Sequence, residues 1–188
     1  MSEPVAALGG ARFHGLVDIA ELPPRGMITL RGDLSAATLR KAAADLAGVD
    51  FPGQRGASVG GERGLLWMSP DEVMVLLPRA EAAAGVATLS AALKGTHHMA
   101  VDVSDARSLF RLSGGPVREV LAKLTPADLH PDAFGPGEVR RTKLSQVAAA
   151  FWMTDAATVE LMAFRSVAVY VFDLLSNAAA ADARVDLF

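Results

Sequence analysis

The two halves of this sequence show the same succession of predicted elements, and this repetition limits the possible folds more than any other feature. Each half predicts a strand, a helix, two or three further strands and a closing helix. Two short segments also match: residues 66–69 (LWMS) resemble 151–154 (FWMT), and 78–80 (PRA) resemble 164–166 (FRS) with one residue inserted. Chance could produce the Trp-Met match alone. Together with the shared order, it favours a duplicated α+β unit.

The first half is predicted to span residues 27–103. Alternating or continuous apolar runs predict strands at 27–31, 65–68, 72–77 and 97–103. Helices are expected between the cap residues 32–35 and Gly48, and over 79–94 before Gly95. The glycine-rich residues 52–64 contain neither Gly-Lys-Ser/Thr nor GxGxxG, so we favour a flexible hairpin or surface loop over a ligand loop.

The second half is predicted to span residues 104–188, and an N-terminal arm of residues 1–26 precedes both halves. Strands are expected at 108–112, 138–143, 146–152 and 158–163. Pro116 opens a helix, and a last helix starts at Ser166. The inward positions of these two helices are predicted to be Val117, Val120, Leu121 and Leu124 in the first, and Val167, Tyr170, Val171, Leu174, Leu175 and Ala178 in the last. We expect the two halves to form one compact domain.

Composition excludes several classes of function. The 188 residues include no Cys, which removes thiol catalysis, disulfides and thiolate metal sites. A formal net charge of -3 without a run of Lys or Arg argues against nucleic-acid binding. No stretch reaches the roughly 20 apolar residues of a membrane span, and the first residues lack the pattern of a secretory signal, so we expect a cytoplasmic protein.

Few residues could carry chemistry. His97 and His98 are adjacent in a predicted strand and should point to opposite faces, so no metal site is expected there. Ser104 and Asp105, which follow Asp102, could suggest a nucleophile beside an acid, but there is no GxSxG elbow and no histidine partner. We therefore interpret Asp102 and Ser104 as a turn or cap. Trp67 and Trp152 are predicted to be core residues at equivalent places in the two halves.

The basic run of residues 140–143 (RRTK) allows two interpretations. It could hold an anion, or it could be an exposed sheet edge protected by charge. We favour an edge or a subunit contact. Asp128, His130 and Arg141 are therefore the candidate contact residues, and they are expected to face a partner chain rather than a substrate.

The central motifs together resemble one known family. Residues 102–104 (DVS), 109–124 (LFRLSGGPVREVLAKL), 127–144 (ADLHPDAFGPGEVRRTKL) and 149–152 (AAFW) resemble the gamma subunit of heterotetrameric sarcosine oxidase, as does the terminal segment 164–179. The resemblance covers about residues 60–181. A more distant similarity is to the folate-binding domain of the glycine-cleavage aminomethyltransferase. The resemblance implies an intertwined, duplicated α+β fold.

The resemblance also implies an accessory role. In that family the alpha, beta and delta subunits are the partners of gamma, and the complex oxidises sarcosine to glycine, forms hydrogen peroxide and passes a one-carbon unit to tetrahydrofolate. FAD, FMN, NAD, tetrahydrofolate and zinc are associated with the other subunits, so no cofactor and no catalytic residue is expected in this chain. The alternatives are a stand-alone folate-binding or aminomethyltransferase-like protein, and a self-assembling structural protein.

Overall fold

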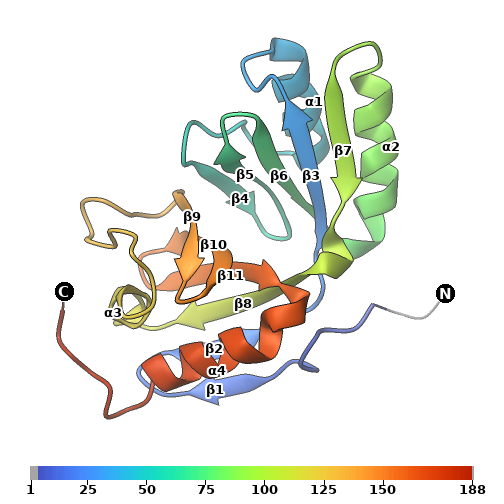
Figure 1. The fold of residues 1–188 in the computed structure, drawn as a ribbon. Coiled ribbons are helices and arrows are strands. Elements are labelled where there is room, and N and C mark those ends of the chain that lie inside the picture. The colour runs from blue at the N-terminus through green and yellow to red at the C-terminus, as the bar shows by residue number, and fades with distance from the viewer. Residues whose placement is uncertain (1–3, 188) are drawn as a thin grey trace. The chain divides into compact units, whose positions relative to one another are not determined.

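The computed structural model describes residues 4–187 of the chain. These residues form two compact units. The continuous unit consists of Arg25–Asp105, and the discontinuous unit combines the residues up to Pro24 with those from Ala106 onward. Each unit contains one antiparallel sheet with helices packed on one face (Figure 1). The α+β class predicted from the sequence is confirmed.

The continuous unit contains a five-stranded sheet in the order β4-β5-β6-β3-β7. Its elements along the chain are β3 (Gly26–Gly32), α1 (Ala37–Ala47), β4 (Ala57–Gly60), β5 (Arg63–Ser69), β6 (Glu72–Leu77), the 3-10 turn η1 (Arg79–Glu81), α2 (Ala82–Ala92) and β7 (His98–Asp102). Alternate apolar residues of β3 and β6, such as Leu30 and Val75, share one core with Leu39 of α1 and Leu89 of α2. Within the glycine-rich segment, β4 pairs with the start of β5, which is the hairpin predicted there.

The discontinuous unit contains a six-stranded sheet in the order β1-β2-β8-β11-β10-β9. Its elements are β1 (Arg12–His14), β2 (Asp18–Glu21), β8 (Arg107–Ser113), α3 (Val117–Ala122), β9 (Val139–Leu144), β10 (Val147–Asp155), β11 (Thr158–Phe164), η3 (Arg165–Val167) and α4 (Ala168–Ala178). The 3-10 turn η2 (Ser104–Ala106) leads into β8. The core joins Phe110, Phe151 and Leu161 of the sheet to Val120 of α3 and Val171 of α4.

Three expectations differ from the structure. The segment before Met27 contributes β1 and β2 to a sheet, although an arm was expected; two strands this short carry no sustained alternation. The helix after Pro116 ends at Ala122, where Lys123 and Leu124 continue only as a turn before Pro126. Tyr170 is exposed on α4, and its hydroxyl donates to Ser145 Oγ at 3.3 Å.

The sheet registers show the duplication directly, and they correct its alignment. The β5–β6 hairpin shifts register between Trp67 and Ser69, and the β10–β11 hairpin shifts between Met153 and Asp155. Trp67 therefore corresponds to Met153, and the predicted equivalence of the two tryptophans is wrong by one residue. Because a one-residue shift reverses the face of a strand, Trp67 packs beneath the helices whereas Trp152 lies on the opposite face of its sheet.

This correction also removes the insertion that the sequence alignment required. Counting from the two hairpins, Pro78 corresponds to Phe164 and Arg79 to Arg165 without a gap. Both pairs occupy the same place, because η1 and η3 directly precede the N-termini of α2 and α4.

The two repeats exchange strands. β2 is followed in the chain by β3, yet β2 pairs with β8; β7 is followed by β8, yet it pairs with β3. Equivalent hydrogen bonds end the two pairings, from Leu22 N–H to the Leu109 carbonyl and from Val103 N–H to the Met27 carbonyl, each at 2.8 Å. With β2 assigned to the repeat that continues with β3, and β7 to the repeat that continues with β8, each repeat contributes one strand to the sheet of the other unit, which is the intertwining that the resemblance implied.

The C-terminal residues are fastened by a buried carboxylate in α3. Glu119 accepts the Val185 N–H at 2.8 Å, and Lys123 Nζ, 3.3 Å from Glu119, donates to the Ala178 and Ala183 carbonyls. The Val185 hydrogen bond, followed by the Lys123 hydrogen bond and charge, holds the pKa of Glu119 below its ordinary value of 4.5.

Acid should therefore release the C-terminal segment. A lowered pKa stabilises the folded form above the ordinary pKa, and this stabilisation is lost as the pH falls below about 4.5 through the lower folded value. We expect the protection factor of the Val185 amide, which compares its exchange rate with that of an unstructured peptide at the same pH, to fall in this range, as NMR can measure. Glu119→Gln, which cannot ionise, should remove the pH dependence; unchanged acid protection of Val185 in the native chain would contradict the assignment.

No helix among the described residues is both long and apolar enough to cross a membrane.

Candidate functional site

The three residues predicted to contact a partner lie on two elements. Asp128 and His130 share the turn between α3 and β9, where the Asp128 carboxylate accepts the His130 N–H at 2.9 Å. His130 Nδ1 in turn accepts the Asp132 N–H at 3.3 Å and lies 3.6 Å from its carboxylate. Arg141 is exposed on β9, the outer strand of its sheet. The structure thus brings Asp128 and His130 together and places Arg141 on the sheet edge.

Two arginines hold the loop that contains Asp128 and His130. Arg140 donates to the Ala133 carbonyl, and its guanidinium lies 4.9 Å from the centre of the Phe134 ring. Arg118 of α3 donates to the carbonyls of Leu129 and Phe134. Within the basic run, Arg140 is therefore a structural residue, whereas Arg141 and Lys143 are exposed on the other face of β9.

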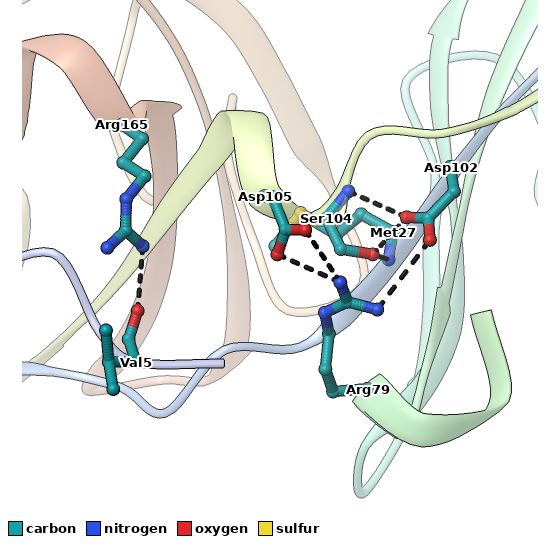
Figure 2. Close-up of polar contacts among 7 residues, drawn as sticks. All are labelled: Val5, Met27, Arg79, Asp102, Ser104, Asp105 and Arg165. Carbon is teal, nitrogen blue, oxygen red and sulfur yellow. Dashed lines mark hydrogen bonds and ion pairs between the residues drawn. The ribbon is translucent and has the colours of Figure 1, made fainter. Parts of the chain in front are cut away.

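The Asp102–Ser104 motif is a structural cap rather than a nucleophilic pair. Ser104 is buried; its hydroxyl donates to Asp102 Oδ1 at 2.5 Å and accepts the Met27 N–H at 2.9 Å (Figure 2). Asp102 Oδ1 also accepts the Ser104 N–H at 2.9 Å. Because both functions of the hydroxyl are occupied, the motif fixes the end of β7 to the start of β3, as the turn or cap interpretation predicts.

Ser104→Ala is expected to lower the free energy of unfolding by about 1–3 kcal/mol, because the Met27 N–H would lose its acceptor in a buried place. Urea denaturation of the isolated chain measures this change. Ser108→Ala is a matched control, since the Ser108 hydroxyl is buried and makes no hydrogen bond. Equal stabilities of the two variants would show that the Ser104 cap contributes little.

Arg79 completes this cluster. Its guanidinium Nη2 donates to both oxygens of Asp105 at 2.9 Å, and Nη1 lies 3.6 Å from Asp102 (Figure 2). The equivalent Arg165 instead donates to the Val5 carbonyl at 2.8 Å. Glu21, the equivalent of Asp102, accepts the backbone N–H groups of Leu8 and Gly10. Arg79 and Asp102 thus form an ion pair in the continuous unit, whereas their equivalents Arg165 and Glu21 each bind the N-terminal segment of the discontinuous unit.

An ion pair with one buried partner crosses two strands of the discontinuous unit. Glu160 of β11 lies opposite Arg111 of β8, with 2.7 Å between the Glu160 Oε1 and Arg111 Nη2 atoms. The Glu160 side chain is 3% exposed, whereas that of Arg111 is 46% exposed. Trp152, the next residue in this cross-strand row, is fully buried, and its indole N–H has no hydrogen-bond partner.

Sequence reasoning missed Arg118, Arg140 and Glu160 as organising residues. A charged residue inside the apolar strand Val159–Ala163 was the available signal for Glu160, because charge is rarely buried without a partner. Arg118 and Arg140 donate to backbone carbonyls, and every residue type has a backbone carbonyl, so the sequence carries no such signal for them. Across residues 4–187, no group of three or more His, Asp or Glu side chains could hold a metal ion.

The model of the sarcosine oxidase gamma subunit family matches residues 31–181. The sarcosine oxidase subunit gamma of an Arthrobacter species is 38% identical over 156 residues, which are 82% of this chain and 74% of that protein.

Solved structures agree in fold. A chain of the heterotetrameric sarcosine oxidase from Corynebacterium sp. U-96, solved in complex with pyrrole 2-carboxylate, matches with a TM-score of 0.81 and 25% identity, covering 94% of this chain and 91% of that one. The glycine cleavage system aminomethyltransferase T of Bartonella henselae matches with a TM-score of 0.59 and 18% identity, covering 82% of this chain and 44% of that one. The second likeness shows a shared fold alone.

Proposed function

This chain belongs to the sarcosine oxidase gamma subunit family, and on that basis we propose that it is the gamma subunit of a heterotetrameric sarcosine oxidase. The observation that carries the proposal is the family match over residues 31–181, supported by a structural match that spans nearly the whole of both chains. The complex would oxidise sarcosine to glycine, form hydrogen peroxide and transfer the one-carbon unit to tetrahydrofolate.

Within this complex the chain acts as an accessory subunit rather than as the catalyst. The best nucleophile candidate, Ser104, is buried and engaged in a backbone cap, which supports this role. The flavins, NAD, tetrahydrofolate and zinc belong to the alpha, beta and delta subunits. We place the complex in the cytoplasm, and the absence of Cys from the sequence is compatible with that reducing compartment.

Asp128, His130 and Arg141 form part of the subunit contact in this proposal. All three side chains are exposed, while Arg118 and Arg140 fix the loop that carries Asp128 and His130. A loop held in one conformation loses little conformational entropy when it binds a partner, which supports its use as a contact.

Co-expression with the alpha, beta and delta subunits of a sarcosine oxidase tests the proposal. We expect a four-subunit complex on size-exclusion chromatography and sarcosine-dependent formation of hydrogen peroxide. A chain that elutes apart from the other three subunits would refute the assignment. The alternative of a stand-alone folate-binding protein rests on the fold alone, and calorimetry with tetrahydrofolate on the isolated chain tests it separately.

Arg141→Glu is expected to weaken assembly about tenfold, because a reversed charge at a partner contact is repelled where the native charge is attracted. Lys143→Glu is a matched control, since Lys143 is exposed on the same face of β9. Surface plasmon resonance against the remaining subunits measures both affinities. If the two substitutions weaken binding equally, the effect belongs to the general charge of β9 and Arg141 is not a specific contact.

A further inference from the structure

Comparison of the two repeats shows that β7 lacks the outer neighbouring strand that its equivalent β2 has. β2 and β7 are equivalent strands: β2 pairs with β8, and β7 pairs with β3. The other edge of β2 is covered by β1, through the pairs Arg12↔Ala20, Phe13↔Ile19 and His14↔Asp18. β7 is the last strand of its sheet, so among the described residues no strand covers the equivalent edge (Figure 1).

The side chains of β7 indicate what could cover it. Met99 and Val101 lie on one face and are 44% and 43% exposed, while Ala100 faces the helices and packs against their core. In the discontinuous unit, β1 matches its neighbour chemically. Phe13, opposite the buried Ile19, packs on the core, and His14 Nδ1 lies 2.7 Å from the Asp18 carboxylate.

The β7 edge also lacks the usual protection against pairing. Exposed edges are commonly protected by Lys and other charged residues, or by Pro. β9, the outer strand of the other sheet, carries Arg140, Arg141 and Lys143. β7 reads His-Met-Ala-Val-Asp, and the carboxylate of its one acidic residue, Asp102, already faces Arg79.

We propose that an extended apolar segment of a partner subunit pairs antiparallel with β7 in the assembled oxidase, as β1 pairs with β2. This inference rests on the proposed function. The segment would carry apolar side chains opposite Met99 and Val101, because these two exposed residues replace the polar Asp18 and the small Ala20 of the equivalent strand. Main-chain hydrogen bonds would supply affinity and these apolar contacts specificity.

The register of β7 identifies the amide that should report the pairing. Val103 donates to the Met27 carbonyl, so alternate residues Val101 and Met99 also direct their N–H groups toward β3. The N–H of Ala100 consequently points to the uncovered edge. Its hydrogen exchange measures whether another strand is bound there.

Hydrogen–deuterium exchange on the isolated chain and on the purified four-subunit complex tests the proposal. We expect the Ala100 amide to exchange at least about tenfold more slowly in the complex than in the isolated chain. A complex that forms without protecting Ala100 would overturn the inference and leave the proposed function intact. If no complex forms, the proposed function and this inference both fail. An isolated dimer with Ala100 already protected would also overturn it, since a second copy would then occupy the edge.

Val101→Lys supplies a second measurement, because the lysine would place a charge opposite an apolar side chain of the bound partner segment. We expect the affinity for the other subunits to fall about tenfold. Val169→Lys is the matched control: Val169 is 62% exposed on α4 and lies outside the β7 edge. Equal affinities of the two variants would contradict the proposal.

Discussion

Arg111→Ala is expected to lower the free energy of unfolding by about 3 kcal/mol, because it leaves the Glu160 carboxylate buried without its guanidinium. The two partners are not equally exposed: Glu160 is buried, while nearly half of the Arg111 side chain reaches solvent. Removing the buried partner therefore costs less than removing the exposed one, since the remaining arginine can be hydrated. Urea denaturation followed by circular dichroism measures the change.

The reciprocal substitution is the control for this asymmetry. Glu160→Gln keeps the shape of the side chain and leaves Arg111 charged and partly exposed, so we expect a loss of about 1 kcal/mol. The double variant Arg111→Ala with Glu160→Gln should recover part of the stability lost by Arg111→Ala alone. A greater loss from Glu160→Gln than from Arg111→Ala would show that the carboxylate is stabilised chiefly by groups other than Arg111.

Most strands and helices of this fold could be predicted from the sequence because each has a sustained apolar pattern, either periodic or continuous. The apolar run of β6 and the Ser-Pro-Asp turn before it are examples, since six consecutive residues of β6 are buried. β1 and β2 could not be predicted, because strands of three and four residues gain their stability from pairing, β1 with β2 and β2 with β8, rather than from local pattern.

The duplication was visible in the order of elements but not in its register. The two Trp-Met pairs suggest that Trp67 corresponds to Trp152, whereas the turns of the two hairpins show that Trp67 corresponds to Met153. Side-chain identity carries less information here than the position of the turn, because the turn sets which face every following residue takes.

The candidate site was predictable only in part. Exposure of Arg141 followed from charge in an edge strand, and the cap at Ser104 followed from the Asp-x-Ser pattern. Arg118 and Arg140 bind backbone carbonyls of a loop that lies beside them only in the folded chain. Contacts of this kind depend on tertiary structure, so the residue types alone could not identify them.

Replacing Gly15 with alanine is expected to destabilise the fold more than the same change at any other glycine of the described residues. It lies between β1 and β2, and the Leu16 N–H that follows it donates to the Ala179 carbonyl, just beyond the end of α4, at 2.7 Å. A Cβ at position 15 would lie 2.0 Å from that carbonyl oxygen and 2.7 Å from Cε1 of Phe13. The carbonyl belongs to backbone, so a rotamer change cannot relieve the overlap.

Gly15→Ala must therefore separate the β1–β2 turn from the end of α4 and break the Leu16 hydrogen bond. We expect a destabilisation of about 3 kcal/mol, which for a chain of this size lowers Tm by roughly 6–12 °C in differential scanning calorimetry. Gly53→Ala is the control, since no atom lies within 4 Å of its added Cβ. If both variants melt with the native chain, the turn shifts without cost and does not fasten β1 and β2 to α4. A selective loss in Gly15→Ala would instead show that the N-terminal strands are integral to the sheet and are not an arm beside it.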